Sequence, residues 1–337
     1  MMTTKLAELK KHKKLFLVLM FAVLCVMPFV TSTATTRLLT TVFIYCISSY
    51  GLMLIFGFTG MMCAGYAAFY GTGAYISAIL AKTYGMPFFV CLLAAALGTA
   101  LVGFIICLPC LRLSVDFIGL ISTAFLNIFL AIVRNWTSVT GGPVGIIGIP
   151  RPKIFGLEIN EKFGFYFLML FFAVLCYVLV NNILNSKIGR NMKGIRDNEI
   201  GTVAIGVKAR GTKLLVFTIG SFLAGLSGSL YGFYINAVNP ANFVFAISTT
   251  FVQMCVLGGL GTLPGAVIGA TFITVLPEVI RPLALYRLGV GGLIMVVMMV
   301  FRPQGIAGSR AFAGDQGLMD RIRQSAAFRK KKKELKE

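Results

Sequence analysis

The sequence is poor in the side chains on which most catalysis depends. Its 337 residues include one histidine, His12, and only eleven Asp or Glu residues. A metal-dependent membrane enzyme needs clustered His, Asp or Glu side chains, and a serine or cysteine hydrolase needs a base beside its nucleophile. Neither arrangement can be assembled from this set. We therefore expect no enzymatic activity, no resident metal and no cofactor.

Charged residues are also scarce, at 12% of the chain, whereas 58% of the residues are hydrophobic. Soluble proteins average about 25% charged and about 45–50% apolar residues. One soluble core cannot bury this excess, so we predict an all-α integral membrane protein. The net charge of +20 comes from the tails and short connections rather than from one face. This distribution argues against nucleic acid as a partner.

Apolar stretches near the length of about 20 residues that a helix needs to cross a bilayer recur along the chain. We predict about ten transmembrane helices, some broken by glycine, at 15–33, 37–57, 65–82, 87–111, 115–133, 163–184, 214–236, 244–260, 264–281 and 283–301. The first stretch is longer than a usual signal-peptide h-region, which favours a retained helix, and a cleaved signal peptide is the alternative.

The distribution of basic residues predicts the orientation. With the N-terminus in the cytoplasm, the cytoplasmic segments hold 23 of the 31 Lys and Arg residues, as the positive-inside rule requires. Both termini are then cytoplasmic. We predict basic tails at 1–14 and 307–337 around one polytopic domain at 15–306. Its longest connections are a cytoplasmic loop at 185–213 and an extracytoplasmic loop at 134–162.

Glycine interrupts the helical pattern in two stretches, at 51–75 and 257–269. Close helix packing explains many such glycines, but interrupted segments at comparable places in two halves also mark translocation pathways. Five helices in each half would invert the second half relative to the first. We expect the two stretches to approach each other beside a pathway.

Polar and glycine positions within the apolar segments are candidates for lining or gating such a pathway. Each of them has an alternative role as an ordinary contact between helices. The candidates are Gly65, Tyr66, Tyr70, Asn127, Tyr234, Gln253, Gly258 and Gly265.

The sequence carries no energy source of its own. Segment 206–213 lacks the Gly-Lys-Ser/Thr order of a P-loop. Of the acidic residues, only Asp116 and Glu278 fall within predicted spans, and both lie near a helix end. Ion-coupled carriers place ionisable groups within their helices. The predicted pathway is therefore passive, or another subunit drives it.

The cytoplasmic loop contains the signature of a short helix at 198–207. Asn198 or Asp197 can cap it, and Glu199 in its first turn complements the helix dipole. Helical spacing collects one apolar stripe, made of Ile200, Val203, Ala204 and Val207. The stripe either enters a groove of another protein or lies against this chain's own helices, and the pattern leaves both open.

This loop resembles the coupling segment of ABC-importer permeases, in the version found in branched-chain amino-acid transporters of the Liv system. Further blocks in the same order are similar to the M-type permease subunit of these systems. They are GYAAFY and GAY within 65–75, TGGP and GIP within 140–150, VLGGLGT at 256–262, LPE at 276–278 and FRPQG at 301–305. Together the resemblance covers 37–306.

The resemblance implies a permease subunit of an ATP-driven importer in the bacterial inner membrane, with a bundle of about ten spans and two inverted halves. It implies a second permease, two cytoplasmic ATPase subunits and an extracytoplasmic solute-binding protein as partners, with branched-chain or related amino acids as substrate. The residues it assigns to ATPase coupling are Arg196, Asp197, Asn198, Glu199, Ile200, Val203 and Ala204.

Two departures from the family leave the solute open, because many relatives have His at Tyr66 and some have a polar residue at Val144. Permeases for urea or another small polar solute share the same pattern. A stand-alone channel or secondary carrier is the rival class, and it would move solute without ATPases. We also expect the 134–162 loop to face the binding protein.

Overall fold

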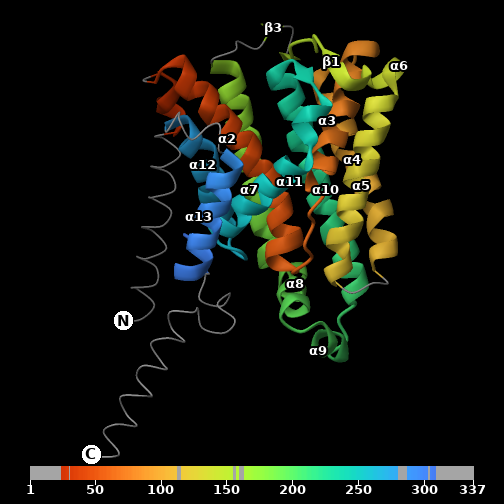
Figure 1. Ribbon diagram of the computed structural model, residues 1–337, viewed down its shortest axis with the longest axis vertical. Coiled ribbons are helices and arrows are strands. Elements are labelled where there is room, and N and C mark those ends of the chain that lie inside the picture. The colour runs from red at the N-terminus through yellow and green to blue at the C-terminus, as the bar shows by residue number, and fades with distance from the viewer. Residues whose placement is uncertain are drawn as a thin grey trace, which may run out of the picture.

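The computed structural model describes residues 24–29, 31–111, 115–154, 157–158, 163–279, 287–302 and 304–308. Within these ranges the chain is a bundle of helices (Figure 1). A helix satisfies every backbone N–H and C=O group within one segment, so long apolar runs favour it in a bilayer.

The helices and strands follow one another along the chain with short connections. The first half contains α2 (Thr33–Leu52), the π-helix η1 (Met53–Phe58), α3 (Tyr66–Thr83), α4 (Phe88–Cys110), α5 (Val115–Asn135), α6 (Thr137–Thr140), η2 (Gly142–Val144) and β1 (Ile146–Ile147). The second contains β2 (Lys153–Ile154), β3 (Leu157–Glu158), α7 (Phe163–Asn185), α8 (Lys187–Asp197), α9 (Glu199–Ala204), α10 (Ala209–Ile235), β4 (Ala237–Val238), η3 (Pro240–Phe243), α11 (Phe245–Gly258), α12 (Leu263–Val279) and α13 (Arg287–Phe301).

Five helices in the described ranges are long and apolar enough to cross a membrane. They are Thr33–Phe58, Phe88–Cys110, Phe117–Asn135, Phe163–Asn185 and Ala209–Ile235. Three more apolar helices are shorter, at Phe245–Gly258, Leu263–Glu278 and Gly291–Phe301. Nine of the predicted segments contain a helix whose ends agree within five residues. The remaining segment, 15–33, falls mostly outside the described residues, which show helix at 24–29.

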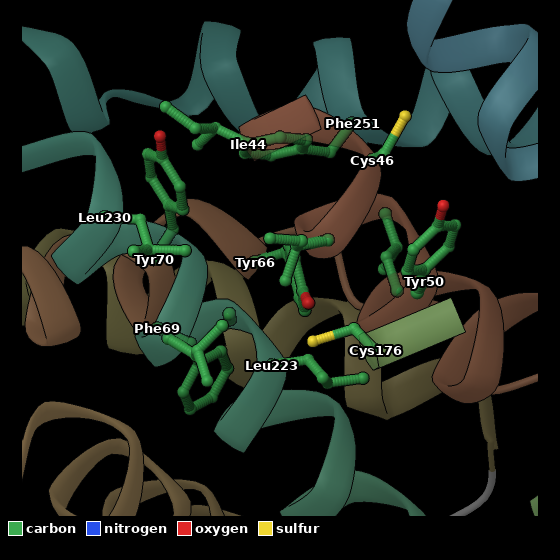
Figure 2. Packing of buried hydrophobic residues seen from close by; sticks show 14 of the residues in the cluster. Ile44, Cys46, Tyr50, Tyr66, Phe69, Tyr70, Cys176, Leu223, Leu230 and Phe251 are labelled. Carbon is green, nitrogen blue, oxygen red and sulfur yellow. The ribbon is translucent and has the colours of Figure 1, made fainter. Parts of the chain in front are cut away.

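Helix α10 forms the centre of the bundle and packs against α2, α3 and α4. Glycine makes this close packing possible, because a Cβ on Gly73 of α3 would overlap the carbonyl group of Gly225 in α10. Large side chains fill the space around these contacts. Figure 2 shows Tyr66, Tyr70 and Phe251 together within this buried cluster, and all three are almost fully inaccessible.

The two ends of the bundle differ in structure. At one end lie the short helices α8 and α9, and at the other lie α6, β1 and β3 (Figure 1). Strand β1 pairs antiparallel with β4, with Ile146 opposite Val238. This pairing ties the 134–162 loop to the end of α10. The Lys82 ammonium adds a hydrogen bond to the carbonyl oxygen of Ile147, at 2.8 Å.

Candidate functional site

Helix α8 is held against the bundle by one apolar face. Its buried residues are Gly189, Met192 and Ile195, and it packs against α7, α10 and η1. Ser186 caps the helix, since its hydroxyl accepts a hydrogen bond from the Ile188 N–H at 3.1 Å. The spacing of the buried residues leaves the basic side chains of α8 on its other faces. No helix was predicted at 187–197 from the sequence.

Helix α9 follows after a single residue, and that residue caps it. The Asn198 side-chain oxygen accepts a hydrogen bond from the Gly201 N–H at 2.9 Å. Thr202 is buried and donates its hydroxyl proton to the Asn198 carbonyl oxygen at 2.7 Å. The Thr202 hydroxyl lies against Gly194 of α8, where an added Cβ would be 2.9 Å from the hydroxyl oxygen. These contacts confirm the predicted cap and fix α9 relative to α8.

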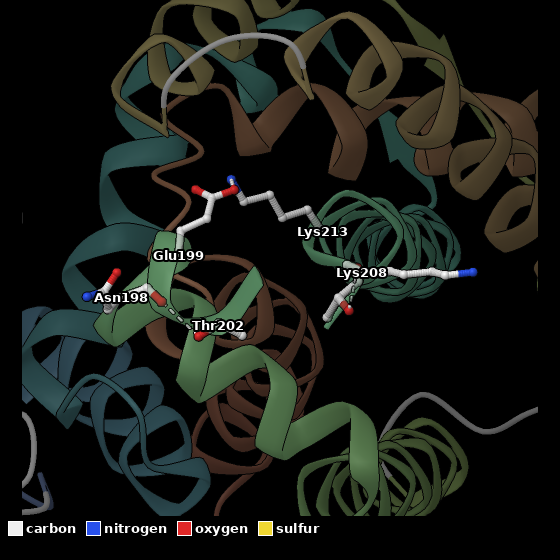
Figure 3. A network of polar contacts seen from close by, with 6 residues as sticks. Asn198, Glu199, Thr202, Lys208 and Lys213 are labelled. Atoms are coloured by element: carbon white, nitrogen blue, oxygen red, sulfur yellow. Dashed lines mark hydrogen bonds and ion pairs between the residues drawn. The ribbon is translucent and has the colours of Figure 1, made fainter. Parts of the chain in front are cut away.

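An ion pair connects α9 to the central helix. The Lys213 ammonium of α10 lies 2.6 Å from the Glu199 carboxylate, and Figure 3 shows the lysine reaching across to α9. The Lys213 side chain is 7% exposed and that of Glu199 is 39% exposed. The attraction between two charges grows where water is excluded, and loss of one partner is costly because the other charge stays buried. Glu199 therefore orients α9 through α10.

The apolar residues of α9 point away from the described chain. Ile200 is 84% exposed, and Val203 and Ala204 are exposed as well. The alternative in which the stripe packs against the chain's own helices is therefore wrong for these three residues within the described structure, whereas Val207, the fourth residue of the stripe, is half-buried. Ile205, which the stripe had not included, is also exposed, because the helix ends before it. Together Ile200, Val203, Ala204 and Ile205 form what we call the α9 apolar surface.

Charged side chains of α8 reach the π-helix η1. The Arg196 guanidinium bonds to the Asp197 carboxylate at 2.8 Å and lies 3.5 Å from the carbonyl oxygen of Gly57. The Lys193 ammonium lies 6.0 Å from the centre of the Phe58 ring, within range of a cation–π contact. The cluster thus links α8 to the end of η1.

The candidate tyrosines lie inside the subunit. The Tyr66 hydroxyl lies 2.9 Å from the Ser48 carbonyl oxygen and 3.1 Å from that of Gly220, so it joins α3 to α2 and α10. Tyr70 is buried among aromatic rings that include Phe251, and its hydroxyl has no hydrogen-bond partner within the described residues.

The other polar candidates lie on different elements. Asn127 is exposed on α5. The Tyr234 hydroxyl donates to the Arg37 carbonyl oxygen at 3.2 Å. Gln253 of α11 is buried, and its side-chain oxygen would lie 2.7 Å from a Cβ placed on Gly291 of α13. In the described part of the chain, no contact joins these three side chains to one another.

The two glycine-broken stretches meet, as predicted, but at other glycines than the candidates. A Cβ on Gly57 would lie 3.0 Å from the Gly261 nitrogen. Gly65 instead packs against α5, since a Cβ on Gly65 would overlap the Ser122 carbonyl group. Gly258 and Gly265 pack α11 against α12, since a Cβ on the first would overlap the carbonyl group of the second. The described ranges hold no group of three or more His, Cys, Asp or Glu side chains that could bind a metal.

Comparison with known proteins places these features in a family. The family model described as "Branched-chain amino acid transport system / permease component" matches residues 34–302. Among solved structures, no significant match was found.

Three relatives illustrate the range of similarity. The branched-chain amino acid transport system permease protein LivM of Escherichia coli K12 is 34% identical over 87% of this chain and 75% of its own length. The permease protein LivH of Salmonella typhimurium, from a system of the same description, is 25% identical over 78% of this chain and 91% of its own. The autoinducer 2 import system permease protein LsrC of Salmonella typhi is 25% identical over 52% of each chain.

Proposed function

Since the chain belongs to the family of branched-chain amino acid transport system permease components, we propose that it is a transmembrane subunit of an ATP-driven importer. It forms the pathway together with a second, related permease. Two ATPase subunits bind on the cytoplasmic side and a solute-binding protein docks on the other. The similarity to both LivM and LivH supports a pair of related permeases.

The proposal includes the topology predicted from sequence. The chain crosses the bacterial inner membrane about ten times in two inverted halves, with both termini, α8 and α9 in the cytoplasm. The loop at 134–162 then faces the binding protein, at the opposite end of the bundle from α9 (Figure 1). The candidate residues of the sequence analysis line or flank the pathway.

The proposed solute is a branched-chain or related amino acid. Support comes from the family description and from LivM, which matches most of this chain. The match to LsrC shows that similar permeases occur in systems named for another solute. Urea or another small polar solute is therefore the alternative. Measuring the uptake of labelled leucine and of labelled urea by the complete complex distinguishes the two.

One observation carries the assignment of ATPase coupling, namely that an exposed apolar surface sits on a firmly anchored helix. A six-residue helix is too short to be stable in isolation. Here the Asn198 cap, buried Thr202 and the Glu199–Lys213 pair hold α9 in place. Ile200 lies on this anchored helix and is still largely exposed. An apolar side chain held in place in this way fits a groove of a partner protein. Lys193 and Asp197 would contact the rim of that groove, where charges contribute little.

The test replaces one residue of the α9 apolar surface. Because Ile200 is 84% exposed, Ile200→Asp should change subunit stability by no more than about 0.5 kcal/mol. In the groove of an ATPase the same carboxylate would be buried without a partner, which costs several kcal/mol, roughly 3–5. Pull-down of the two ATPase subunits and ATP-driven uptake should both fall at least a hundredfold.

The matched control is Ile147→Asp, which makes the same change at an exposed site on the opposite end of the bundle. It should leave ATPase pull-down unchanged. Full ATPase binding and full uptake by Ile200→Asp would refute α9 as the coupling element. Uptake by the purified chain alone, without ATPases, would favour a stand-alone carrier instead.

A further inference from the structure

Aromatic side chains gather around η3, the short helix that follows β4. The Phe243 ring of η3 lies among three tyrosine rings, at centroid distances of 5.7, 6.0 and 6.4 Å from Tyr70, Tyr75 and Tyr231. We call these three tyrosines the aromatic cage. Phe243 is completely buried, so its ring fills the space between them. Tyr231 is only half-buried, so one wall of the cage borders the surface of the described chain.

Two hydroxyl groups of the cage have no hydrogen-bond partner in the described part of the chain. They belong to Tyr70, which is 1% exposed, and to Tyr75, which is 4% exposed. Most buried polar groups are hydrogen-bonded, because an unsatisfied one costs free energy. Tyr66 shows this usual arrangement, since its hydroxyl bonds to two carbonyl oxygens. Figure 2 shows the Tyr66 and Tyr70 hydroxyls pointing to opposite sides of the cluster. Two unsatisfied hydroxyls around one ring indicate a site for a polar ligand rather than an apolar core.

The residue that fills the cage belongs to a segment tied to the 134–162 loop. Asn239 caps η3, since its side-chain oxygen accepts a hydrogen bond from the Ala241 N–H at 2.8 Å. The Asn239 side-chain nitrogen donates to the Val144 carbonyl oxygen at 3.3 Å. Val144 itself is 63% exposed. A protein that docks on this loop could therefore displace η3 and withdraw Phe243 from the cage.

We propose that the aromatic cage is a solute-binding site of the pathway and that Phe243 is the plug that closes it. The inference rests on the proposed function and specifies the chemistry of the solute. Tyrosine faces attract a cation, and phenol hydroxyls can donate to a carboxylate or accept from an ammonium. The space that the Phe243 ring fills suits an apolar side chain. A zwitterionic amino acid with such a side chain meets all of these conditions, whereas urea has neither a charge nor an apolar part.

The first experiment removes the two hydroxyls and leaves the rings in place. Tyr70→Phe and Tyr75→Phe each delete a buried hydroxyl without a partner, so neither variant should unfold at a lower SDS concentration than the wild type. Uptake of labelled leucine by the complete complex, with its binding protein and ATP, should nevertheless fall about three- to tenfold, as expected for one lost hydrogen bond to the solute.

Tyr66→Phe is the matched control, because the same change there breaks two hydrogen bonds to backbone carbonyls. It should lower the SDS concentration at which the subunit unfolds. Unchanged leucine uptake in both cage variants would refute the cage as a solute site. Lower stability of both cage variants would refute it equally, since the hydroxyls would then be bonded within the folded chain.

The second experiment follows the plug by thiol labelling. In Phe243→Cys, the new thiol should react slowly with N-ethylmaleimide while the binding protein is absent. During ATP-driven uptake it should react at least about tenfold faster, because labelling follows the population of the open form. Val144→Cys, at an exposed position of the neighbouring loop, should react equally fast in both conditions. Equal labelling of position 243 in the two conditions would refute the plug, and the uptake experiment does not depend on this variant.

Failure of this inference can be distinguished from failure of the proposed function. If the wild-type complex takes up leucine and both cage variants do so equally well, the importer assignment stands and only the cage is refuted. If the wild-type complex takes up urea but not leucine, the proposed solute is refuted, and the cage as an amino-acid site with it.

Discussion

The ion pair between Glu199 and Lys213 gives the sharpest quantitative prediction. The two side chains, 2.6 Å apart, differ in environment, since Lys213 is 7% exposed and Glu199 is 39% exposed. Removing either charge leaves the other without its partner. The consequence should differ between the two, because water reaches the carboxylate far better than the ammonium.

The magnitudes follow from this asymmetry. Glu199→Gln leaves a nearly buried ammonium beside a neutral acceptor, which should lower the free energy of unfolding by about 2–3 kcal/mol. Lys213→Met leaves a partly hydrated carboxylate and fills the space of the lysine stem, so about 1 kcal/mol is expected. The double variant has no uncompensated charge. It should therefore cost less than the two single variants together, with an interaction energy of about 1–2 kcal/mol.

The assay is a double-mutant cycle measured by SDS titration of the purified subunit. A second readout is the ratio of solute uptake to ATP hydrolysis in the complete complex. This ratio should fall in Glu199→Gln, because α9 loses its connection to α10 while its apolar surface remains. Equal costs for both single variants, or strict additivity in the double variant, would refute the reasoning from burial.

Two further predictions concern packing and thiol reactivity. A Cβ on Gly228 of α10 would overlap the Tyr70 carbonyl oxygen, so Gly228→Ala should destabilise by about 1–3 kcal/mol in SDS titration. Gly211→Ala, in the same helix with open space around it, should instead stabilise by up to about 1 kcal/mol. Burial raises the pKa of the Cys63 thiol, in the connection between η1 and α3, to about 12. The thiol stays protonated at pH 8, so N-ethylmaleimide should modify it only after denaturation, and labelling in native membranes would contradict this.

Hydropathy predicted the helices well because length and apolarity are what a bilayer requires. It placed the start of α10 at residue 214, whereas the helix begins at Ala209. The first turns of α10 contain Arg210 and Lys213, and a search for apolar runs does not detect polar helix ends. The same limit explains why α8 was not predicted, since its apolar face consists of few residues among many basic ones.

Contacts between distant segments explain the features that the sequence did not reveal. Strands β1 and β4 have two residues each and their paired residues are 90 and 92 positions apart, so no local pattern marks them. Glu199 was expected to complement the dipole of its own short helix, and its pairing with Lys213, fourteen residues away, follows no local pattern that would predict it.

The arrangement of α8 and α9 shows how a small displacement could reach the middle of the bundle. Their unit is connected to α10 through Lys213 and to η1 through Arg196, which contacts Gly57. Gly57 in turn adjoins Gly261 in the second glycine-broken stretch. A π-helix is rare and occurs frequently at functional sites. A push on the α9 apolar surface would therefore act on two core elements at once, α10 and η1. The route from α8 to the second glycine-broken stretch runs through Arg196 and Gly57, so a displacement of α8 should reach that stretch by this contact.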